Sequence, residues 1–286
     1  MCVPELPEVE TIRRDLVPLV VGRVISGVCI DPATAPLLVD APPETVGASL
    51  VGRRIERLER RGKYLLFALD DGRWFVAHLR MTGRLVWRPT GAPAEPYERA
   101  RIMLDNGYDL RWNDLRKFGT WRVTQEPGEA VAMLGPEPLD EAFTVGYLRR
   151  ALRGRTAPVK AVLLDQRRVA GLGNIYVDEA LFAARIRPDT PAGELTAGAV
   201  ARLHRAIRCV IAQGIEHRGA SFRDYVDAQG NEGRQHMYVQ VFRRQGKPCY
   251  RCGTEIVRTV VGGRGTHYCP KCQPQPRARA RRRVVV

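Results

Sequence analysis

The sequence contains no run of about 18 apolar residues, which is the length that a membrane-spanning helix requires. Its first residues also lack the long apolar stretch of a secretory signal, and acidic residues appear early, at Glu5 and Glu8. The two absences predict a cytoplasmic protein with no contact to a membrane. A length of 286 residues predicts about two domains.

Acidic residues are in short supply. The chain has 31 Asp and Glu against 46 Lys and Arg, which gives a formal net charge of +15 and a pI of about 10.0. This excess of positive charge favours a polyanionic partner, and nucleic acid fits better than a membrane surface. A generally basic proteome is the alternative that charge alone leaves open.

Seven cysteines in a cytoplasmic chain are more typical of metal ligands than of disulfides. Four of them form two Cys-x-x-Cys pairs, Cys249 with Cys252 and Cys269 with Cys272. Each pair can place two thiolates on one metal ion, and two pairs complete a tetrahedral zinc site. Because four thiolates leave no open position, one structural Zn²⁺ is predicted here and not a catalytic one.

The stretch that organises the chain is residues 4–11, Pro-Glu-Leu-Pro-Glu-Val-Glu-Thr. Pro7 suits the first turn of a helix, and the acidic residues around it favour the positive end of the helix dipole. Apolar residues then recur at helical spacing as far as Leu19. An amphipathic helix is therefore predicted here, ended or kinked by Pro18.

Pro4 has a second possible meaning. If it is the first residue of the mature chain, its nitrogen is a secondary amine, and the ordinary pKa of an α-amino group, about 7.7–8.0, leaves part of it unprotonated near neutral pH. Such an amine can attack an aldehyde-like carbon and form a Schiff base. Glu5 and Glu8 would then supply a general acid and an orienting carboxylate.

The first half of the chain reads as short strands with tight turns. Asp70-Asp71-Gly72 and Asp105-Asn106-Gly107 are strong hairpin signals, because glycine accepts a positive φ. The pattern predicts a β-sandwich or barrel, with residues 31–50 as a surface loop. The expected strands are residues 23–30, 53–61, 63–69, 73–79, 83–87, 101–104, 108–113 and 119–123.

The second half reads as helical. Helices are expected over residues 144–153, 158–164, 175–184 and 197–213, with Asn174 and Thr196 as caps. A glycine-rich turn over residues 169–175 precedes one of them; an ordinary tight turn and a phosphate-binding turn both remain open. The cationic residues 60–63 are likewise either a solvated strand edge or a phosphate contact.

Taken together, these motifs resemble the formamidopyrimidine-DNA glycosylases, a family that excises oxidised purines from DNA. The resemblance runs from residue 4 to residue 273 and keeps the family order of motifs. It implies an α+β chain of two domains: an N-terminal catalytic β-sandwich with an N-terminal helix, and a C-terminal helix–two-turns–helix domain with a four-cysteine zinc hairpin. The expected boundaries are residues 1–134 for the sandwich, 135–140 for a hinge, 141–240 for the helical domain, 241–273 for the zinc finger and 274–286 for a disordered basic tail.

The resemblance implies the chemistry of a bifunctional glycosylase and lyase. Pro4 would attack C1′ of the damaged nucleotide, Glu5 would protonate the opening sugar ring and Glu8 would orient the site. Lys63 would hold the backbone beside the lesion. Successive β and δ eliminations would then cut the strand, with no catalytic metal or nucleotide cofactor.

The resemblance also implies DNA contacts. In the first half, Met81 would fill the space left by the flipped base, Arg116 would pair with the orphaned base, and Phe118 would wedge into the stack. In the second half, Asn174 and Arg264 would bind phosphates, and Lys160 would reach toward the lesion or its backbone. A mobile loop over residues 220–238 would close over the extruded base. The expected partner is double-stranded DNA with oxidised purines or abasic sites, bound by a monomer.

One departure from the family pattern concerns the start. Met1, Cys2 and Val3 precede Pro4, and with them attached the Pro4 nitrogen is a tertiary amide that cannot act as a nucleophile. A protease could remove them; the favoured hypothesis is that Val3 is a GTG start codon, translated as Met and then cleaved. Two alternatives stay open: an endonuclease VIII-like glycosylase for oxidised pyrimidines, against which Leu6 argues, and a non-catalytic DNA-binding protein if residues 1–3 are retained.

Overall fold

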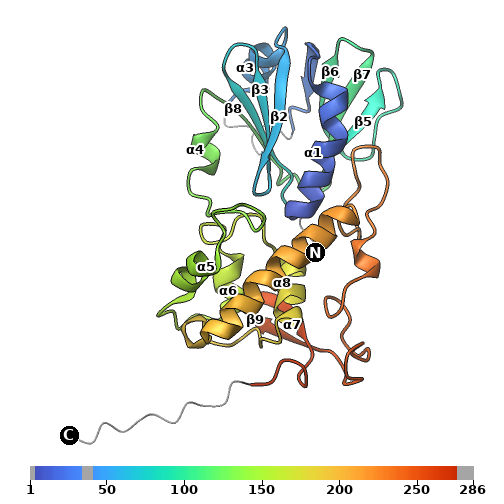
Figure 1. Cartoon of the computed structure of the whole chain (residues 1–286). Coiled ribbons are helices and arrows are strands. Elements are labelled where there is room, and N and C mark those ends of the chain that lie inside the picture. The colour runs from blue at the N-terminus through green and yellow to red at the C-terminus, as the bar shows by residue number, and fades with distance from the viewer. Residues whose placement is uncertain (1–3, 34–40, 276–286) are drawn as a thin grey trace, which may run out of the picture. The chain divides into compact units, whose positions relative to one another are not determined.

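The computed structural model of the chain describes residues 4–33 and 41–275 (Figure 1). These residues form two compact units, each assembled from three stretches of chain. The first unit contains Met1–Phe143, Asp165–Gly173 and Arg208–Tyr238; the second contains Thr144–Leu164, Asn174–Ile207 and Val239–Val286. The sequence-based domain boundaries stay a prediction, and the basic tail, expected to be disordered, lies outside the described residues from position 276 onward.

The chain's first helix, α1 (Leu6–Val20), begins as the sequence predicts. Glu5 is its N-cap, Pro7 lies in its first turn, and Glu5 and Glu8 form a reciprocal capping box. Pro18 does not end the helix, which continues to Val20. Because Pro18 is exposed, water can satisfy the carbonyl that loses its N–H donor there, and the interruption is tolerated in the last turn.

The first unit contains the predicted β-sandwich, built from two antiparallel four-stranded sheets. One sheet has the order β1 (Ile25–Ile30), β6 (Glu98–Leu104), β7 (Tyr108–Asp114), β5 (Gly83–Pro89). The other has the order β2 (Ile55–Arg61), β3 (Tyr64–Leu69), β4 (Trp74–His78), β8 (Thr120–Thr124). All eight expected strands are confirmed. Gly72 and Gly107 have φ of +83° and +78°, the left-handed conformation that the two hairpin turns require.

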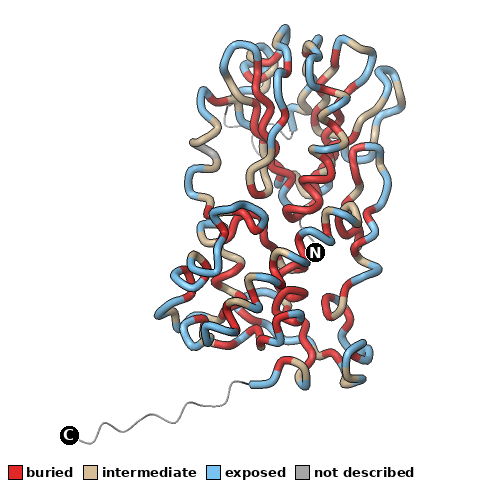
Figure 2. Tube along the Cα trace, in the orientation of Figure 1, coloured by how far each residue is buried: buried red, intermediate tan, exposed pale blue. Residues whose placement is uncertain are grey.

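Side chains from both sheets and from α1 fill the sandwich core. Trp112 of β7 and Trp121 of β8 meet edge to face, with ring centroids 5.7 Å apart. Val9, Ile12 and Leu16 bring the apolar face of α1 into the same core. Figure 2 shows buried stretches along α1 and the strands. Each fully buried aliphatic side chain contributes about 1.5–3 kcal/mol, so the core fixes the position of α1.

The prediction of a surface loop over residues 31–50 is wrong in its second half. A short helix, α3 (Pro43–Leu50), lies there, while residues 34–40 are outside the described part of the chain. Pro43 suits the first helical turn, and Val46 and Leu50 are buried one turn apart. Two apolar positions in a Pro- and Ala-rich stretch were too weak a periodic signal. A single further turn, α4 (Gly128–Val131), follows β8.

The second unit carries the predicted helices and a hairpin. Its helices are α5 (Val145–Leu152), α6 (Val159–Leu164), α7 (Asn174–Ala183), a 3₁₀ turn η1 (Ala192–Glu194) and the first part of α8 (Ala197–Glu216). Thr144 and Thr196 cap their helices through the hydroxyl oxygens, each of which accepts a backbone N–H. Strands β9 (Val257–Val261) and β10 (Arg264–Tyr268) form the hairpin. Of the helices in the described ranges, none combines the length and apolar composition needed to traverse a bilayer.

Candidate functional site

Pro4, Glu5 and Glu8 lie together at the N-terminal end of α1, and all three are buried in the first unit. Glu5 is 2 % exposed and Glu8 is 1 % exposed. The Glu8 carboxylate accepts hydrogen bonds from the backbone N–H of Glu5 (2.9 Å) and from that of Ala220 (2.7 Å). Glu8 therefore joins the start of α1 to the start of the 220–238 segment, which is 212 residues further along the chain.

The glycine-rich turn packs directly on Glu5. The Gly171 carbonyl accepts a hydrogen bond from the Leu6 N–H at 3.0 Å. Gly171 has a φ of +84°, and a Cβ there would lie 2.6 Å from Leu6 Cδ1. A Cβ on Gly173 would overlap the carboxyl carbon of Glu5. The turn is tight, and its glycines allow the backbone to approach the glutamate. Phosphate binding at this turn stays a prediction.

Replacing Gly173 by Ala should therefore displace Glu5 and lower activity. A Cβ in this closely packed position forces either the turn or the glutamate to move, and a shift of about 1 Å in a reacting group can cost on the order of 100-fold in rate. The measurement is a single turnover of the predicted excision reaction by Gly173→Ala. Gly128→Ala is the matched control, because nothing lies within 4 Å of the added carbon. Equal rates for the two variants would contradict the account.

The segment after α8 covers Glu8 with a buried tyrosine. The Tyr225 hydroxyl donates a hydrogen bond to the Arg218 carbonyl at 3.1 Å and lies 3.4 Å from the Glu8 carbonyl. Burial, and then the nearby Glu8 charge, raise the pKa of Tyr225 well above its ordinary value, so the hydroxyl remains a neutral donor. The Ser221 hydroxyl donates to the Tyr225 carbonyl at 2.7 Å. The mobility expected for residues 220–238 stays a prediction.

Sequence reasoning missed an ion-pair group at the base of this segment. Arg218 bridges Asp15 of α1 at 2.7 Å and Asp227 at 2.6 Å. The Ala228 carbonyl accepts a hydrogen bond from the Trp87 N–H of β5 at 2.8 Å, and Ala228 is fully buried. Because the partners are far apart in sequence, no local pattern indicated that residues 227–228 are anchored to the sandwich.

Arg60 and Arg61, which were candidates for phosphate contacts, are used inside the first unit. Arg60 pairs with Glu10 at 2.9 Å and with Glu137 at 2.6 Å. The Arg61 guanidinium donates to the Gly135 carbonyl at 2.6 Å. Burial alone would raise the pKa of Glu10, but hydrogen bonds from Arg13, Arg60 and Arg14 outweigh it and lower that pKa to about 2. Arg60, whose side chain is 11 % exposed, does not lie on a solvated strand edge, and a phosphate contact by Arg61 stays a prediction.

Lys63 lies at the turn between β2 and β3 and is half-buried. Its charge acts on His78 in β4: burial first, and then the charges of Arg80 and Lys63, lower the pKa of His78 to about 3. His78 is therefore a neutral ring near neutral pH, and its Nδ1 accepts the Arg80 N–H at 3.0 Å. The role of Lys63 beside a lesion stays a prediction.

Three of the predicted DNA-contacting side chains lie together in the first unit. The Arg116 guanidinium stacks over the Phe118 ring at 4.6 Å, and its Nη1 donates to Met81 Sδ at 3.3 Å. Phe118 is 45 % exposed, so part of its ring surface is open to solvent beside Arg116. The cluster joins the turn after β4 to the segment after β7. We call these three residues the probe cluster.

In the second unit, the predicted residues Lys160, Asn174 and Arg264 meet at the β9–β10 hairpin. The Gly265 carbonyl accepts hydrogen bonds from Lys160 Nζ (3.1 Å) and Asn174 Nδ2 (2.9 Å). Gly262 and Gly263 form the turn, with φ of +58° and +73°, and the exposed Arg264 follows it. The contact of Arg264 with a phosphate stays a prediction.

The prediction that Lys160 reaches DNA needs correction. Lys160 Nζ pairs with Asp178 Oδ1 at 2.7 Å, and both side chains are fully buried. Asp178 Oδ2 also accepts the His267 N–H of β10 at 2.9 Å. Because its ammonium group is buried and paired with a carboxylate, Lys160 does not face solvent. It positions the hairpin through its hydrogen bond to the Gly265 carbonyl.

The four predicted cysteines form a cluster in the second unit, with all sulfur atoms within 4.8 Å of one another. The sulfur atoms of Cys249 and Cys272 are 4.0 Å apart, and those of Cys252 and Cys269 are 3.5 Å apart. Four sulfurs around one zinc ion at about 2.3 Å would be about 3.8 Å apart, so the residues fit the ion. The closed thiolate set has a structural role, as the sequence predicted. It packs against Phe182, Val241 and Ile256.

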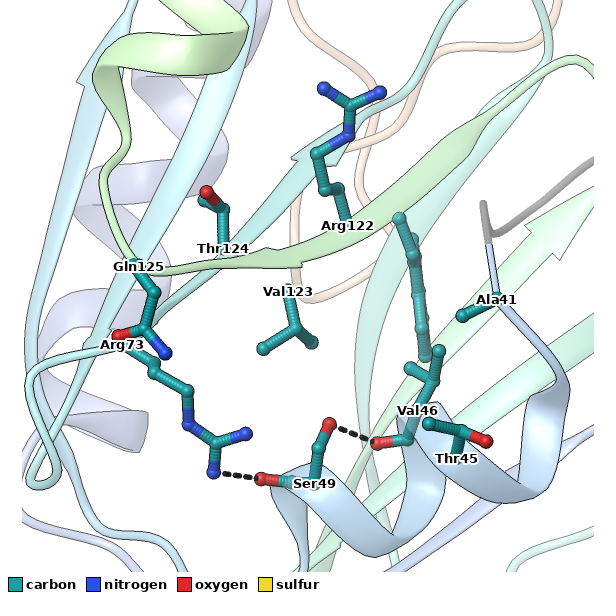
Figure 3. A pocket seen from close by; sticks show the side chains of 10 residues that line it. Ala41, Thr45, Val46, Ser49, Arg73, Arg122, Val123, Thr124 and Gln125 are labelled. Carbon is teal, nitrogen blue, oxygen red and sulfur yellow. Dashed lines mark hydrogen bonds between the residues drawn. The ribbon is translucent and has the colours of Figure 1, made fainter.

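A hollow elsewhere in the first unit contains none of the predicted site residues. It lies between α3 and β8, where the Arg73 guanidinium reaches the Ser49 carbonyl at 2.7 Å (Figure 3). The Ser49 hydroxyl donates a hydrogen bond to the Val46 carbonyl, and Arg73 also forms an ion pair with Asp71. Because none of the residues predicted for the chemistry lines it, the hollow has no part in the predicted site.

Comparison with known proteins agrees with the geometry. Sequence models match over residues 3–121 (formamidopyrimidine-DNA glycosylase N-terminal domain), 134–226 (formamidopyrimidine-DNA glycosylase H2TH domain) and 246–275 (zinc finger found in FPG and IleRS). A formamidopyrimidine-DNA glycosylase from Symbiobacterium thermophilum is 49 % identical over 277 residues, which covers 96 % of this chain and 90 % of the relative. The one from Geobacillus kaustophilus is 46 % identical and covers 94 % and 99 %.

Solved structures give the same answer. The MutM (Fpg) protein from Thermus thermophilus has a TM-score of 0.85 at 42 % identity, covering 94 % of this chain and 98 % of that one. The Lactococcus lactis Fpg in complex with DNA containing an abasic site has a TM-score of 0.87 at 37 % identity, covering 95 % and 100 %.

In this chain a β-sandwich unit buries Pro4 and Glu5, and a helical unit carries a hairpin with four zinc-binding cysteines. This is the arrangement of a DNA glycosylase of base-excision repair. The chain belongs to the formamidopyrimidine-DNA glycosylase family.

Proposed function

We propose that this glycosylase removes oxidised purines, 8-oxoguanine and formamidopyrimidines, and then cuts the DNA strand through a Schiff base on Pro4. The observation that carries the proposal is that Pro4, Glu5 and Glu8 are buried together at the start of α1, where Glu8 accepts a hydrogen bond from the Ala220 N–H. The names of its relatives agree, and a Lactococcus lactis relative has been solved with DNA containing Fapy-dG.

The chemistry follows from the positions of three groups. The Pro4 nitrogen attacks C1′, the bond from C1′ to the base breaks, and the base leaves with the proton that the amine loses. Glu5 donates a proton to the ring oxygen as the sugar opens, which leaves an iminium between Pro4 and C1′. Glu8, already bonded to the Glu5 and Ala220 backbones, orients the site. The iminium acidifies the protons at C2′, and β and δ eliminations release the two phosphates.

The proposed DNA contacts use the other predicted residues. The probe cluster, Met81, Arg116 and Phe118, occupies the gap left by the flipped nucleotide and contacts the orphaned base. Asn174 and Arg264 bind phosphates, and Lys63 holds the backbone beside the lesion. Lys160 acts indirectly, through the Gly265 carbonyl that it shares with Asn174. The structural zinc stabilises the hairpin that carries Arg264.

The remaining parts of the proposal concern state and location. We propose a monomer that acts on double-stranded DNA in the cytoplasm, without a membrane partner. Because Pro4 is a nucleophile only when nothing precedes it, the active form begins at Pro4. The alternative, a non-catalytic DNA-binding protein, requires that Met1, Cys2 and Val3 stay attached. Intact-mass measurement of the protein made from its own gene separates the two.

Parallel excision assays test the substrate class. Duplexes with 8-oxoguanine opposite cytosine should be cut much faster than duplexes with thymine glycol, by at least about tenfold, the scale on which a shaped pocket discriminates between bases. An undamaged duplex of the same sequence is the control. Faster cutting of thymine glycol would instead assign the chain to the endonuclease VIII-like activity.

A further inference from the structure

A buried carboxylate that takes no part in the proposed chemistry lies beside the probe cluster. Asp114, at the end of β7, is 1 % exposed. Its Oδ1 accepts hydrogen bonds from the Thr82 hydroxyl (2.5 Å) and the Arg116 N–H (3.1 Å), and its Oδ2 accepts one from the Gly119 N–H (2.7 Å). Hydrogen bonds to a buried charge are stronger than neutral ones, so these three donors are firmly held.

The three donors belong to the two chain segments that carry the probe cluster. Thr82 directly follows Met81, while Arg116 and Gly119 enclose Phe118. The Thr82 hydroxyl also accepts the Arg116 N–H at 3.0 Å, so it bonds to both the carboxylate and the second segment. The pair formed by Asp114 and Thr82 therefore joins segments that are 32 residues apart in the sequence.

The backbone around Phe118 needs such support. Lys117 has a φ of +58°, a left-handed conformation that side chains rarely adopt unless their surroundings enforce it. A Cβ on Gly119 would overlap the Trp112 ring, so the chain passes close to the core just after Phe118. Without the carboxylate, the segment between Asp114 and Gly119 loses the bonds that hold it in this shape.

We propose that Asp114, together with Thr82, is a positioning residue that fixes Met81, Arg116 and Phe118 relative to one another and so sets how strongly the protein discriminates between cytosine and adenine opposite the lesion. The proposal rests on the proposed function, in which Arg116 meets the orphaned base. Discrimination between bases depends on where the guanidinium donors lie, and these atoms are positioned by the Arg116 backbone that the carboxylate holds.

The test compares variants that keep or remove the hydroxyl bond. Thr82→Val removes this bond at nearly constant size, and Thr82→Ser keeps it. Asp114→Asn replaces one carboxylate oxygen by an NH2 group, which cannot accept a hydrogen bond from the donors on that side. The measured quantity is the ratio of kcat/KM for 8-oxoguanine opposite cytosine to that opposite adenine. We expect Thr82→Val and Asp114→Asn to lower this ratio about tenfold, the scale of a lost hydrogen bond to a charged group, and Thr82→Ser to restore it.

Thr90→Val is the matched control. The Thr90 hydroxyl donates a similar hydrogen bond to the buried Asp109 at 2.6 Å. Asp109 and Asp114 lie near opposite ends of β7. This variant should leave the ratio unchanged. Thermal melting of every variant reports whether it folds. If Thr82→Val does not fold, the ratio measured for Asp114→Asn decides the proposal.

A second measurement separates this proposal from the proposed function. Affinity for duplexes with an uncleavable abasic analogue opposite cytosine or adenine needs no reaction at Pro4. The proposal is supported if Thr82→Val lowers the cytosine preference in binding as well. It is overturned if Thr82→Val keeps the preference, or weakens both duplexes equally. If the wild-type protein discriminates in binding but excises neither substrate, only the proposed function fails.

Discussion

Glu5→Gln should abolish base excision while the strand-cutting step at a ready-made abasic site persists. Gln keeps the shape of the side chain and its bonds at the start of α1, but it cannot donate the proton that the opening sugar ring requires. General acid catalysis of this kind contributes about 10²–10⁴-fold to a rate. An abasic sugar already equilibrates with its open aldehyde form, so the Pro4 amine can still react with it. The measurement is single-turnover cutting of the two substrates.

The structure offers a control for this prediction on the same helix. Glu10 is also a buried glutamate of α1, but its carboxylate is committed to Arg13, Arg14 and Arg60. Glu10→Gln should lower stability and leave the excision-to-cutting ratio unchanged. If Glu5→Gln lost both activities equally, the proton-donor role would be wrong and Glu5 would be needed for positioning alone.

Cys249→Ser should empty the zinc site and remove most of the DNA affinity. The hairpin has few apolar contacts of its own, and the metal supplies its folding energy, as in zinc-finger peptides where the ion contributes about 10–16 kcal/mol. Loss of the hairpin releases Gly265, and with it the arrangement of Asn174 and Arg264. Zinc content should fall from one ion per chain toward none, and affinity for an abasic duplex should fall at least about tenfold.

Cys209→Ser is the matched control, because Cys209 is an exposed cysteine on α8 outside the cluster. It should keep its zinc and its affinity. Full affinity of Cys249→Ser without bound zinc would contradict the structural role of the metal. Retention of zinc by Cys249→Ser would show instead that three thiolates suffice.

Local patterns were enough to predict most of the fold. The eight strands followed from short β-type runs and from turns such as the one at Gly72, because hairpins are specified by neighbouring residues. Two Cys-x-x-Cys pairs predicted the metal cluster, because the short spacing within each pair already places two thiolates on one ion. The helix α3 was missed, since only Val46 and Leu50 mark its buried face.

Long-range partners explain where the site was predicted less well. Nothing near Arg60 in the sequence indicates that Glu10 and Glu137 would pair with it, 50 and 77 residues away. The burial of Lys160 depends on Asp178 of the next helix. Gly173 looked like an ordinary turn residue, because its contact with Glu5 exists only in the folded chain. Charges and glycines acquire their roles from partners that sequence spacing does not reveal.

Borohydride trapping on a duplex with 8-oxoguanine opposite cytosine tests the central claim most directly. Protein that begins at Pro4 should form a covalent complex with DNA, and mapping should place the link on the Pro4 nitrogen. The same chain with Met1, Cys2 and Val3 attached should bind the duplex but give no complex. Efficient trapping of that longer chain, or a link to any other residue, would show that a different nucleophile does the chemistry.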